Sequence, residues 1–228
     1  MLRRFVAPLL WGGFLIGVIL IVAERGLPDL PGSPVFGPPA DSRAAFDSWL
    51  EEQPGRRVEF GEFETFLAGE GVGEVVPAWQ LMRVDARYAT QCDIPPFGIP
   101  PRELWPNIVP ALALVRDRVE PTIGPVEVRS SWRTPELNAC ARGAAASKHL
   151  QFAALDLVTR DRQRGENLYR RLCAIHAEAG PPSRMGLGAY FDPAEPRFGG
   201  GRFHIDATGY RSWGRGYTRA SSPCRSFN

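Results

Sequence analysis

The sequence predicts an α+β fold in which helices flank a small antiparallel sheet. Helical and strand patterns follow one another in mixed order, without the regular alternation that builds a parallel sheet. The chain has 24 glycines and 22 prolines among 228 residues, which favours turns and long loops over a helical bundle. Its hydrophobic fraction of 44% is typical of a globular domain that buries a core. The formal charge is only +2 and the arginines are scattered, so no nucleic-acid surface is expected.

The N-terminal segment predicts that most of the chain is exported. Residues 5–23 are all apolar or glycine, and they follow Arg3 and Arg4. As a helix they would span about 28 Å, close to the hydrocarbon thickness of a bilayer. Ile21, at the −3 position of the plausible cleavage site, favours an uncleaved anchor over a signal peptide. We therefore expect residues 1–25 to be a single-pass transmembrane helix in the cytoplasmic (inner) membrane, with the rest of the chain in the periplasm.

The four cysteines lie in the part that is expected to be exported. An even number in an oxidising compartment predicts two disulfides. None of the spacings matches CxxC, so a zinc site made of thiolates is not expected. Three pairings are possible from the sequence. We favour Cys92 with Cys140 and Cys173 with Cys224, which would fasten loops to the core.

The segment after the anchor divides into a spacer and a helical part. Residues 26–40 are rich in proline and glycine, which predicts a semi-extended spacer. Residues 41–99 form a helical preface, in which Asp41 or Ser42 caps the first short helix and further helical turns follow. We expect its aromatic side chains to lie in the core, and the preface to be a subdomain or an arm.

Residues 100–228 are predicted to form the second folded part. Asn107 is the expected cap of its first helix, with Pro110 in the first turn, where no backbone N–H is needed. His176 is expected to be an ordinary helical residue. The predicted elements, in order, are a helix over 104–119, strands over 126–129 and 153–158, a helix over 168–179, a loop over 186–202, a strand over 203–206 and an irregular tail.

Two segments contain the residue types of a metal site. His149 lies just before a predicted strand that carries Asp156, so the chain can bring both toward one point. In the later strand side chains alternate, so burial of its two apolar residues would turn His204 and Asp206 toward a cleft. A catalytic zinc site takes about three nitrogen or oxygen ligands and keeps a position for water, whose proton a nearby carboxylate can take. From spacing alone, structural roles explain these residues equally well.

Three motifs resemble a family of zinc peptidases. Residues 133–138 (RTPELN) are similar to the SxYRSPxxN turn of the zinc D-Ala-D-Ala carboxypeptidase family, peptidase family M15. Residues 147–156 (SKHLQFAALD) resemble its SxHxxGxAxD signature. Residues 203–214 (FHIDATGYRSWG) resemble the HxD…RxW segment of its periplasmic and phage-related branch. Their order and spacing agree over about residues 100–216.

The resemblance implies a hedgehog/DD-peptidase-like fold and a zinc metallopeptidase, with residues 100–228 as its catalytic domain. Together with the anchor predicted over residues 1–25, this gives a membrane-anchored peptidase. It implies that the substrate is a peptidoglycan stem peptide or cross-link, cleaved by a D,D-carboxypeptidase or an endopeptidase. Arg133 would bind or polarise the substrate's carboxylate or scissile carbonyl, and Ser147 would also bind substrate. The implied zinc ligands are His149, Asp156 and His204.

Two positions depart from the family pattern. Phe152 replaces a glycine three residues after the first ligand, which would narrow the pocket or alter the turn. Gly201 stands where some branches carry a glutamate base. We expect Asp206 to serve as the base, with Asp192 and Glu195 as alternatives. The departures leave open a non-hydrolytic, zinc-containing module that binds the cell wall, and a third possibility in which disulfides alone hold a metal-free fold.

Overall fold

The computed structural model describes residues 39–195 and 199–227. The predicted anchor over residues 1–25 lies outside the described residues, as does all but the last two residues of the predicted spacer over 26–40. Within the part of the chain that the structure describes, no helix has both the length and the hydrophobicity needed to cross a bilayer.

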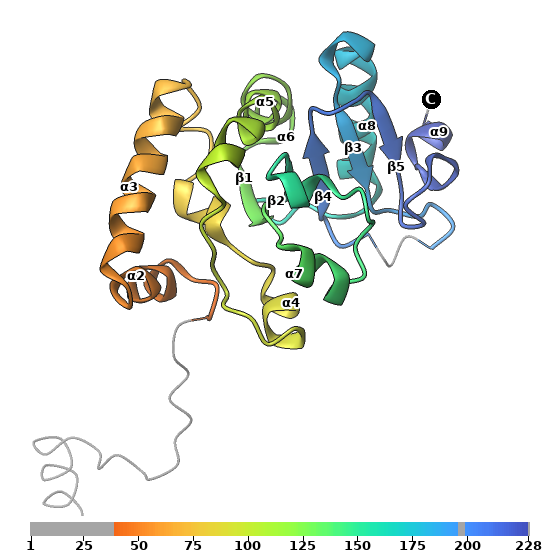
Figure 1. Cartoon of the computed structure of the whole chain (residues 1–228). Coiled ribbons are helices and arrows are strands. Elements are labelled where there is room, and N and C mark those ends of the chain that lie inside the picture. The colour runs from red at the N-terminus through yellow and green to blue at the C-terminus, as the bar shows by residue number, and fades with distance from the viewer. Residues whose placement is uncertain (1–38, 196–198, 228) are drawn as a thin grey trace, which may run out of the picture. The chain divides into compact units, whose positions relative to one another are not determined.

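A five-stranded mixed sheet organises residues 126–213 (Figure 1). Strands β1, β2, β4 and β3 pair antiparallel in that spatial order, whereas β5 lies beyond β3 and pairs parallel to it. The predicted α+β class is therefore confirmed, but the expectation of an antiparallel sheet is wrong at one edge. The turn after β4 reverses the chain and passes β3, so β5 runs in the direction of β3. The strands are β1 (Val126–Ser130), β2 (Ala154–Thr159), β3 (Gly186–Ala189), β4 (Phe203–Asp206) and β5 (Arg211–Trp213).

Strands β3 and β5 occupy positions where the sequence predicted a loop and an irregular tail. β3 reads Gly-Leu-Gly-Ala, and glycine is unfavourable in strands, so no strand pattern is visible. A Cβ at Gly188 would lie 2.9 Å from the Cβ of His204 and 2.9 Å from the Trp213 ring. One at Gly186 would collide with the Asp206 carboxylate. The glycines thus give the side chains of β4 and β5 room over β3.

The sheet separates a core face from a polar face. Helix α5 contacts β4 and helix α8 contacts β3. Because side chains alternate along a strand, the fully buried Leu155, Leu157, Phe203 and Ile205 point into the core, and the residues between them point to the other face. The described α-helices are α2 (Arg43–Glu51), α3 (Pro54–Gly69), α4 (Ala86–Gln91), α5 (Val109–Leu114), α6 (Glu120–Ile123), α7 (Pro135–Cys140), α8 (Gly165–Ala179) and α9 (Cys224–Phe227).

Four helical segments over residues 102–123 replace the single helix predicted over 104–119. A 3-10 helix over Arg102–Ile108 precedes α5, and a π-helical turn over Val115–Val119 separates α5 from α6. Pro110 lies in the first turn of α5, as expected, but the predicted cap is wrong: the Asn107 amide donates to the Gln151 carbonyl at 2.9 Å. The prolines restrict where a continuous α-helix can form. The apolar stripe is nevertheless buried, at Ile108, Leu112, Val115 and Val119.

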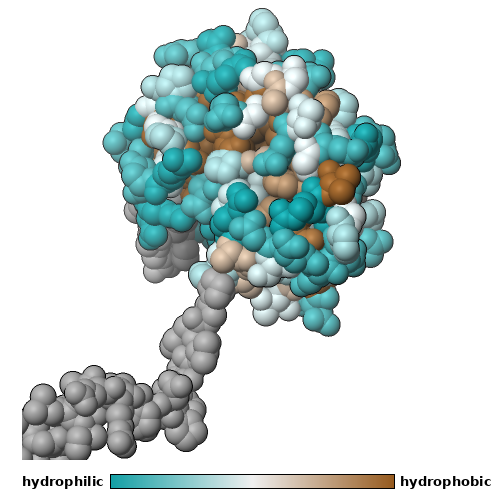
Figure 2. Space-filling view, turned by 90° about the vertical axis from the view of Figure 1, so that its left-hand side faces the viewer, coloured by the Kyte–Doolittle hydropathy of each residue, from teal (hydrophilic) through white to brown (hydrophobic). Residues whose placement is uncertain are grey.

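The helical preface contributes to the same core as the sheet. Ser42 caps α2, as one of the two predicted caps, by accepting from the Ala45 N–H at 3.2 Å. The Phe46 ring lies 4.9 Å from the Phe60 ring and 5.2 Å from the Phe97 ring. One hydrophobic cluster includes these aromatics together with the apolar residues of β1, β2, β3 and β4. The face on the side of α2 and α3 is accordingly mostly hydrophilic, with small hydrophobic patches (Figure 2).

Both favoured disulfides are present. Cys92–Cys140 joins the end of α4 to the last residue of α7, and Cys173–Cys224 joins α8 to the first residue of α9. Each closes a loop of about fifty residues, with sequence separations of 48 and 51. No free cysteine occurs among the described residues, which contain all four.

Candidate metal centre

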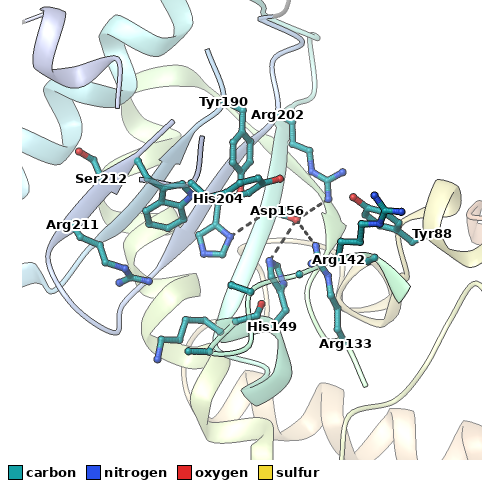
Figure 3. Close-up of a pocket in the computed structure, with 18 of the residues that line it drawn as sticks. Tyr88, Arg133, Arg142, His149, Asp156, Tyr190, Arg202, His204, Arg211 and Ser212 are labelled. Atoms are coloured by element: carbon teal, nitrogen blue, oxygen red, sulfur yellow. Dashed lines mark hydrogen bonds and ion pairs between the residues drawn. The ribbon is translucent and has the colours of Figure 1, made fainter. Parts of the chain in front are cut away.

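Three side chains from different segments meet on the polar face of the sheet. Asp156 on β2 and His204 on β4 are direct register partners. His149 lies in the 3-10 turn Lys148–Gln151, just before β2. One ligand atom from each residue lies within 4.8 Å of the others, and all three residues are buried (Figure 3). The structure therefore brings the three predicted ligands together, although they are separated by up to 55 residues in the chain.

Within residues 39–195 and 199–227, one nitrogen of His149 has no hydrogen-bond partner. Its Nδ1 lies 2.6 Å from the Ser131 carbonyl oxygen, which only accepts, so Nδ1 carries the proton. Nε2 is then a lone-pair acceptor that is buried and unpaired among the described residues, 3.5 Å from Asp156 Oδ2. Burial lowers the pKa of His149, so the ring is neutral near pH 7. A buried lone pair beside a carboxylate fits a bound cation.

His204 is held between two carboxylates. Its Nδ1 lies 3.2 Å from Asp156 Oδ1 and its Nε2 lies 3.1 Å from Asp206 Oδ2. Burial lowers the pKa of His204, but the hydrogen bonds to both carboxylates outweigh it and raise that pKa. The Trp213 ring packs edge-on against the imidazole, with centroids 5.0 Å apart. The orientation of the ring is thus fixed, and Nδ1 faces the other two candidate ligands.

Asp206 lies behind His204 and does not line the cleft. Its side chain is fully buried and accepts two hydrogen bonds from Arg211, at 2.7 and 3.0 Å, and two from Thr208, at 2.7 and 2.9 Å. Burial would raise the pKa of Asp206, but the bonds from His204, Arg211 and Thr208 hold it well below its usual range. This geometry favours a role for Asp206 in orienting the His204 imidazole, rather than the role of general base that was expected from the sequence.

Asp156 is shared between the candidate ligands and two arginines. Its Oδ2 accepts from Arg202 at 2.7 Å and from Arg133 at 3.1 Å, whereas its Oδ1 faces His204. Burial would raise the pKa of Asp156, but the Arg202 charge outweighs it and, together with the hydrogen bond to His204, holds the pKa well below its usual range. Arg202 also pairs with Asp85, just before α4, so the preface reaches the centre through this ion pair.

Arg202 was not identified from the sequence. It precedes His204 by two residues, so strand alternation puts both on one face. The same two-residue spacing that relates His204 to Asp206 was therefore the signal in the sequence that could have identified Arg202. Burial would lower the pKa of Arg202, but Asp156 and Asp85 raise it, so the guanidinium is permanently charged.

A cleft of about 650 Å³ opens over these residues. Arg133 and Ser147, which the sequence analysis expected to bind substrate, both line it. Asp206 and the alternative bases Asp192 and Glu195 are not among its lining residues. Of the carboxylates in the described ranges, only Asp156 lines the cleft.

The two departures from the family pattern have local backbone explanations. Phe152 has φ of 50°, the left-handed region that favours glycine, and its side chain is buried in the core, 5.9 Å from the Phe63 ring. It therefore adopts the turn without narrowing the cleft. Gly201 has φ of 83°, and a Cβ there would collide with the Gln163 carbonyl oxygen. A glutamate at position 201 is thus incompatible with this backbone.

The third histidine lies outside the centre. His176 on α8 stacks on Tyr210, with centroids 4.2 Å apart, and its Nε2 lies 3.1 Å from the Arg211 carbonyl oxygen. It is a packed helical residue, as expected.

A family model described as peptidase M15 matches residues 85–180. The matched segment contains Arg133, His149 and Asp156, whereas His204 follows it in the chain. No curated protein and no solved structure matches the chain.

Proposed function

We propose, on the premise that the chain belongs to the peptidase M15 family through residues 85–180, that the protein is a zinc peptidase of the cell wall. Its substrates are the stem peptides or cross-links of peptidoglycan, and it acts as a D,D-carboxypeptidase or as an endopeptidase. Family membership supports the peptidase class. The peptidoglycan substrate and the membrane anchor are the further steps of the proposal.

The buried, unpaired Nε2 of His149 is the observation that carries the proposal. An imidazole that donates from one nitrogen to a backbone carbonyl and keeps the other nitrogen free is the usual arrangement of a metal-ligating histidine. Asp156 and His204 complete a set of three nitrogen and oxygen donors, the number typical of catalytic zinc sites. Zinc in such a site supplies Lewis acidity, which polarises a carbonyl and makes water a nucleophile near neutral pH.

The side chains around this centre have separate roles in the proposal. Arg133 binds the substrate's carboxylate or scissile carbonyl through the N–H groups that Asp156 leaves free. Arg202 fixes the Asp156 carboxylate and adds positive charge where the carbonyl oxygen becomes negative. Ser147 lines the same cleft and contacts the bound peptide. Asp206 orients the His204 ring instead of accepting a proton from water.

One observation favours a second candidate function. Apart from Asp156, no carboxylate of the described residues lines the cleft to serve as a general base. A protein with the metal centre and no base fits a non-hydrolytic, zinc-containing module that binds cell-wall peptides. Turnover distinguishes the two candidates.

The metal centre is tested by the zinc content of the full-length chain. We expect about one zinc per chain in the wild type and in His176→Ala, and a large loss in His204→Ala, since three donors are needed. His176→Ala is the matched control because it removes the histidine outside the centre. A folded wild type that contains no zinc contradicts the proposal.

Activity is tested with purified muropeptides, with and without a chelator. We expect chelator-sensitive release of D-alanine or loss of cross-linked muropeptides, and a decrease in kcat/KM of about 10²-fold or more in Arg133→Gln. A fully zinc-loaded protein that binds muropeptides and never cleaves them would select the binding module.

The proposed location is the inner membrane, with the folded part in the periplasm. The two disulfides support an oxidising compartment. Fractionation of cells that express the full chain, followed by protease treatment of spheroplasts, checks both parts of this proposal. Full-length protein in the soluble fraction contradicts the anchor.

A further inference from the structure

The cleft has a large excess of positive charge, although the whole chain has a formal charge of only +2. Six cationic side chains and one carboxylate, Asp156, line it. A substrate that enters this cleft meets more positive than negative side chains, which favours anionic groups. The six cations are Arg133, Arg142, Lys148, Arg202, Arg211 and Arg219.

Half of these cations already have carboxylate partners. Arg133 and Arg202 pair with Asp156, and Arg211 pairs with Asp206. For the other half, no side-chain hydrogen bond or ion pair is found within residues 39–195 and 199–227. These are Arg142, Lys148 and Arg219.

The three unpaired cations lie on two segments, which we call the cationic lips: residues 141–148 and residues 214–221. Each lip is close to a disulfide, because Cys140 directly precedes the first and Cys224 follows the second by three residues. Hydrogen bonds within the lips restrict them further.

The first lip is held by local bonds. The Gly143 N–H donates to the Asn138 carbonyl at 2.8 Å, and the Asn138 side chain donates to the Ala144 carbonyl at 3.1 Å. In the second lip, Thr218 and Ser221 form a capping box around the 3-10 turn that carries Arg219. Because the backbone of these segments is already restrained, it loses less conformational freedom when their side chains bind an anion.

From these contacts we infer that the cationic lips form an anion subsite for a second carboxylate of the substrate. The substrate is then a peptide with at least two carboxylates, one at Arg133 beside the metal centre and another among the lip cations Arg142, Lys148 and Arg219, which line the same cleft. A cleft of about 650 Å³ is large enough for a short peptide. This inference rests on the proposed function, because it takes the cleft to be a peptide site.

Binding to the chelator-treated, full-length protein tests the inference without turnover. The probe is a diacetylated γ-glutamyl-lysyl-alanyl-alanine peptide, which has two carboxylates. Its analogue carries an amide in place of the glutamyl carboxylate and has only one. The variants are Arg142→Gln, Lys148→Gln, Arg219→Gln and the triple variant. Arg160→Gln is the matched control, because Arg160 is exposed and lines no part of the cleft.

We expect each single variant to weaken binding of the two-carboxylate peptide about threefold and the triple variant about tenfold or more. The variants should bind the amide analogue as tightly as the wild type does. Arg160→Gln should bind the two-carboxylate peptide as tightly as the wild type does. The advantage of the two-carboxylate peptide should also decrease as salt rises, because exposed charges are screened.

Three outcomes would overturn the inference. The wild type binds both peptides equally, the triple variant loses affinity for both peptides equally, or heparin binds the lips more tightly than the peptide does, which would indicate a polyanion surface. If the charge-dependent binding is found but muropeptides are never cleaved, the inference stands and the hydrolytic function fails. If cleavage occurs without preference for the second carboxylate, the inference alone fails.

Discussion

At the scale of single residues, two backbone conformations explain the two departures from the family pattern. Phe152 adopts a left-handed φ of 50° that glycine would adopt without cost, and its burial against Phe63 offsets a strain of about 1–2 kcal/mol. Gly201 has no such compensation available, because its missing Cβ is what lets the Gln163 carbonyl approach. Packing against the Gln163 carbonyl thus excludes a glutamate at position 201, where some branches of the family carry one.

Substitution of Gly201 is expected to destabilise the fold without adding activity. Gly201→Ala and Gly201→Glu should each lower the free energy of unfolding by about 2 kcal/mol or more, because of the positive φ and the collision with Gln163. Gly200→Ala is the matched control, since a Cβ there meets nothing within 4 Å. Denaturant unfolding measures the difference. A Gly201→Glu variant as stable as the wild type and faster on muropeptides would contradict this account.

The Asp206→Asn variant distinguishes two possible roles of Asp206, orienting His204 or acting as the general base. If Asp206 orients His204, the variant should bind zinc about 10–100-fold more weakly, measured by competition with a chelator. At saturating zinc most of the activity should return, and the pH profile of kcat/KM should keep its acidic limb. Unchanged zinc affinity together with loss of that limb would instead identify Asp206 as the base.

At the scale of elements, the glycines of β3 and the two disulfides are the features that lie next to the cleft residues. β3 lies between β4 and β5 and has glycines at the two positions that His204, Asp206 and Trp213 cover. Strand propensity therefore does not predict β3, because its glycines make room for the side chains of the neighbouring strands and have low strand propensity themselves. Each disulfide has one cysteine close in sequence to a cationic lip: Cys140 directly precedes the first lip, and Cys224 follows the second by three residues.

Removing one disulfide at a time should loosen one lip at a time. The paired Cys92→Ser and Cys140→Ser substitutions should lower the free energy of unfolding by about 4 kcal/mol, as should the paired substitutions of Cys173 and Cys224, by the loop-entropy estimate. Hydrogen exchange should rise at residues 141–148 in the first variant and at residues 214–221 in the second. Equal exchange in both lips of both variants would show that the disulfides do not hold them separately.

At the scale of the whole molecule, positive side chains are concentrated in the cleft although the formal charge of the chain is nearly balanced. The formal charge of +2 gives no sign of a cleft with six cations and one carboxylate. The compensating acidic residues lie elsewhere on the chain or, like Asp206, behind the cleft. Net charge is a sum over the sequence, whereas the potential in a cleft depends on which residues the fold brings to it.

Stability should decrease in acid in a way that depends on the buried carboxylates. The pKa values of Asp156 and Asp206 are held below their usual range, so their contribution is present above the unfolded pKa of about 3.9 and is lost as pH falls below it. Urea unfolding of chelator-treated protein should show stability falling below pH 4, with a shallower fall in Asp206→Asn. Equal slopes would contradict the contribution of Asp206.

The sequence by itself predicted the α+β class. Through the resemblance to the M15 family it also indicated the three candidate ligands and Arg133. It left three disulfide pairings open, and the favoured one is the one the structure contains. Ligand types and motif spacing are local properties, and the strands over 154–159 and 203–206 alternate visibly. Helix 165–179 has an apolar stripe of the usual period.

Only the tertiary structure decided how those residues are arranged and which partners they contact. The pairing of Asp85 with Arg202, the Arg211 bonds that saturate Asp206 and the Gln163 carbonyl against Gly201 each join segments that the sequence treats separately. The prediction of one long helix was wrong because prolines interrupt it, and the prediction of a wholly antiparallel sheet was wrong because the glycine-rich β3 was not recognised as a strand. In both cases the effect of proline or glycine depends on the residues that surround it in space. Hydrogen bonds and close packing depend on positions in space, so no one-dimensional pattern contains them.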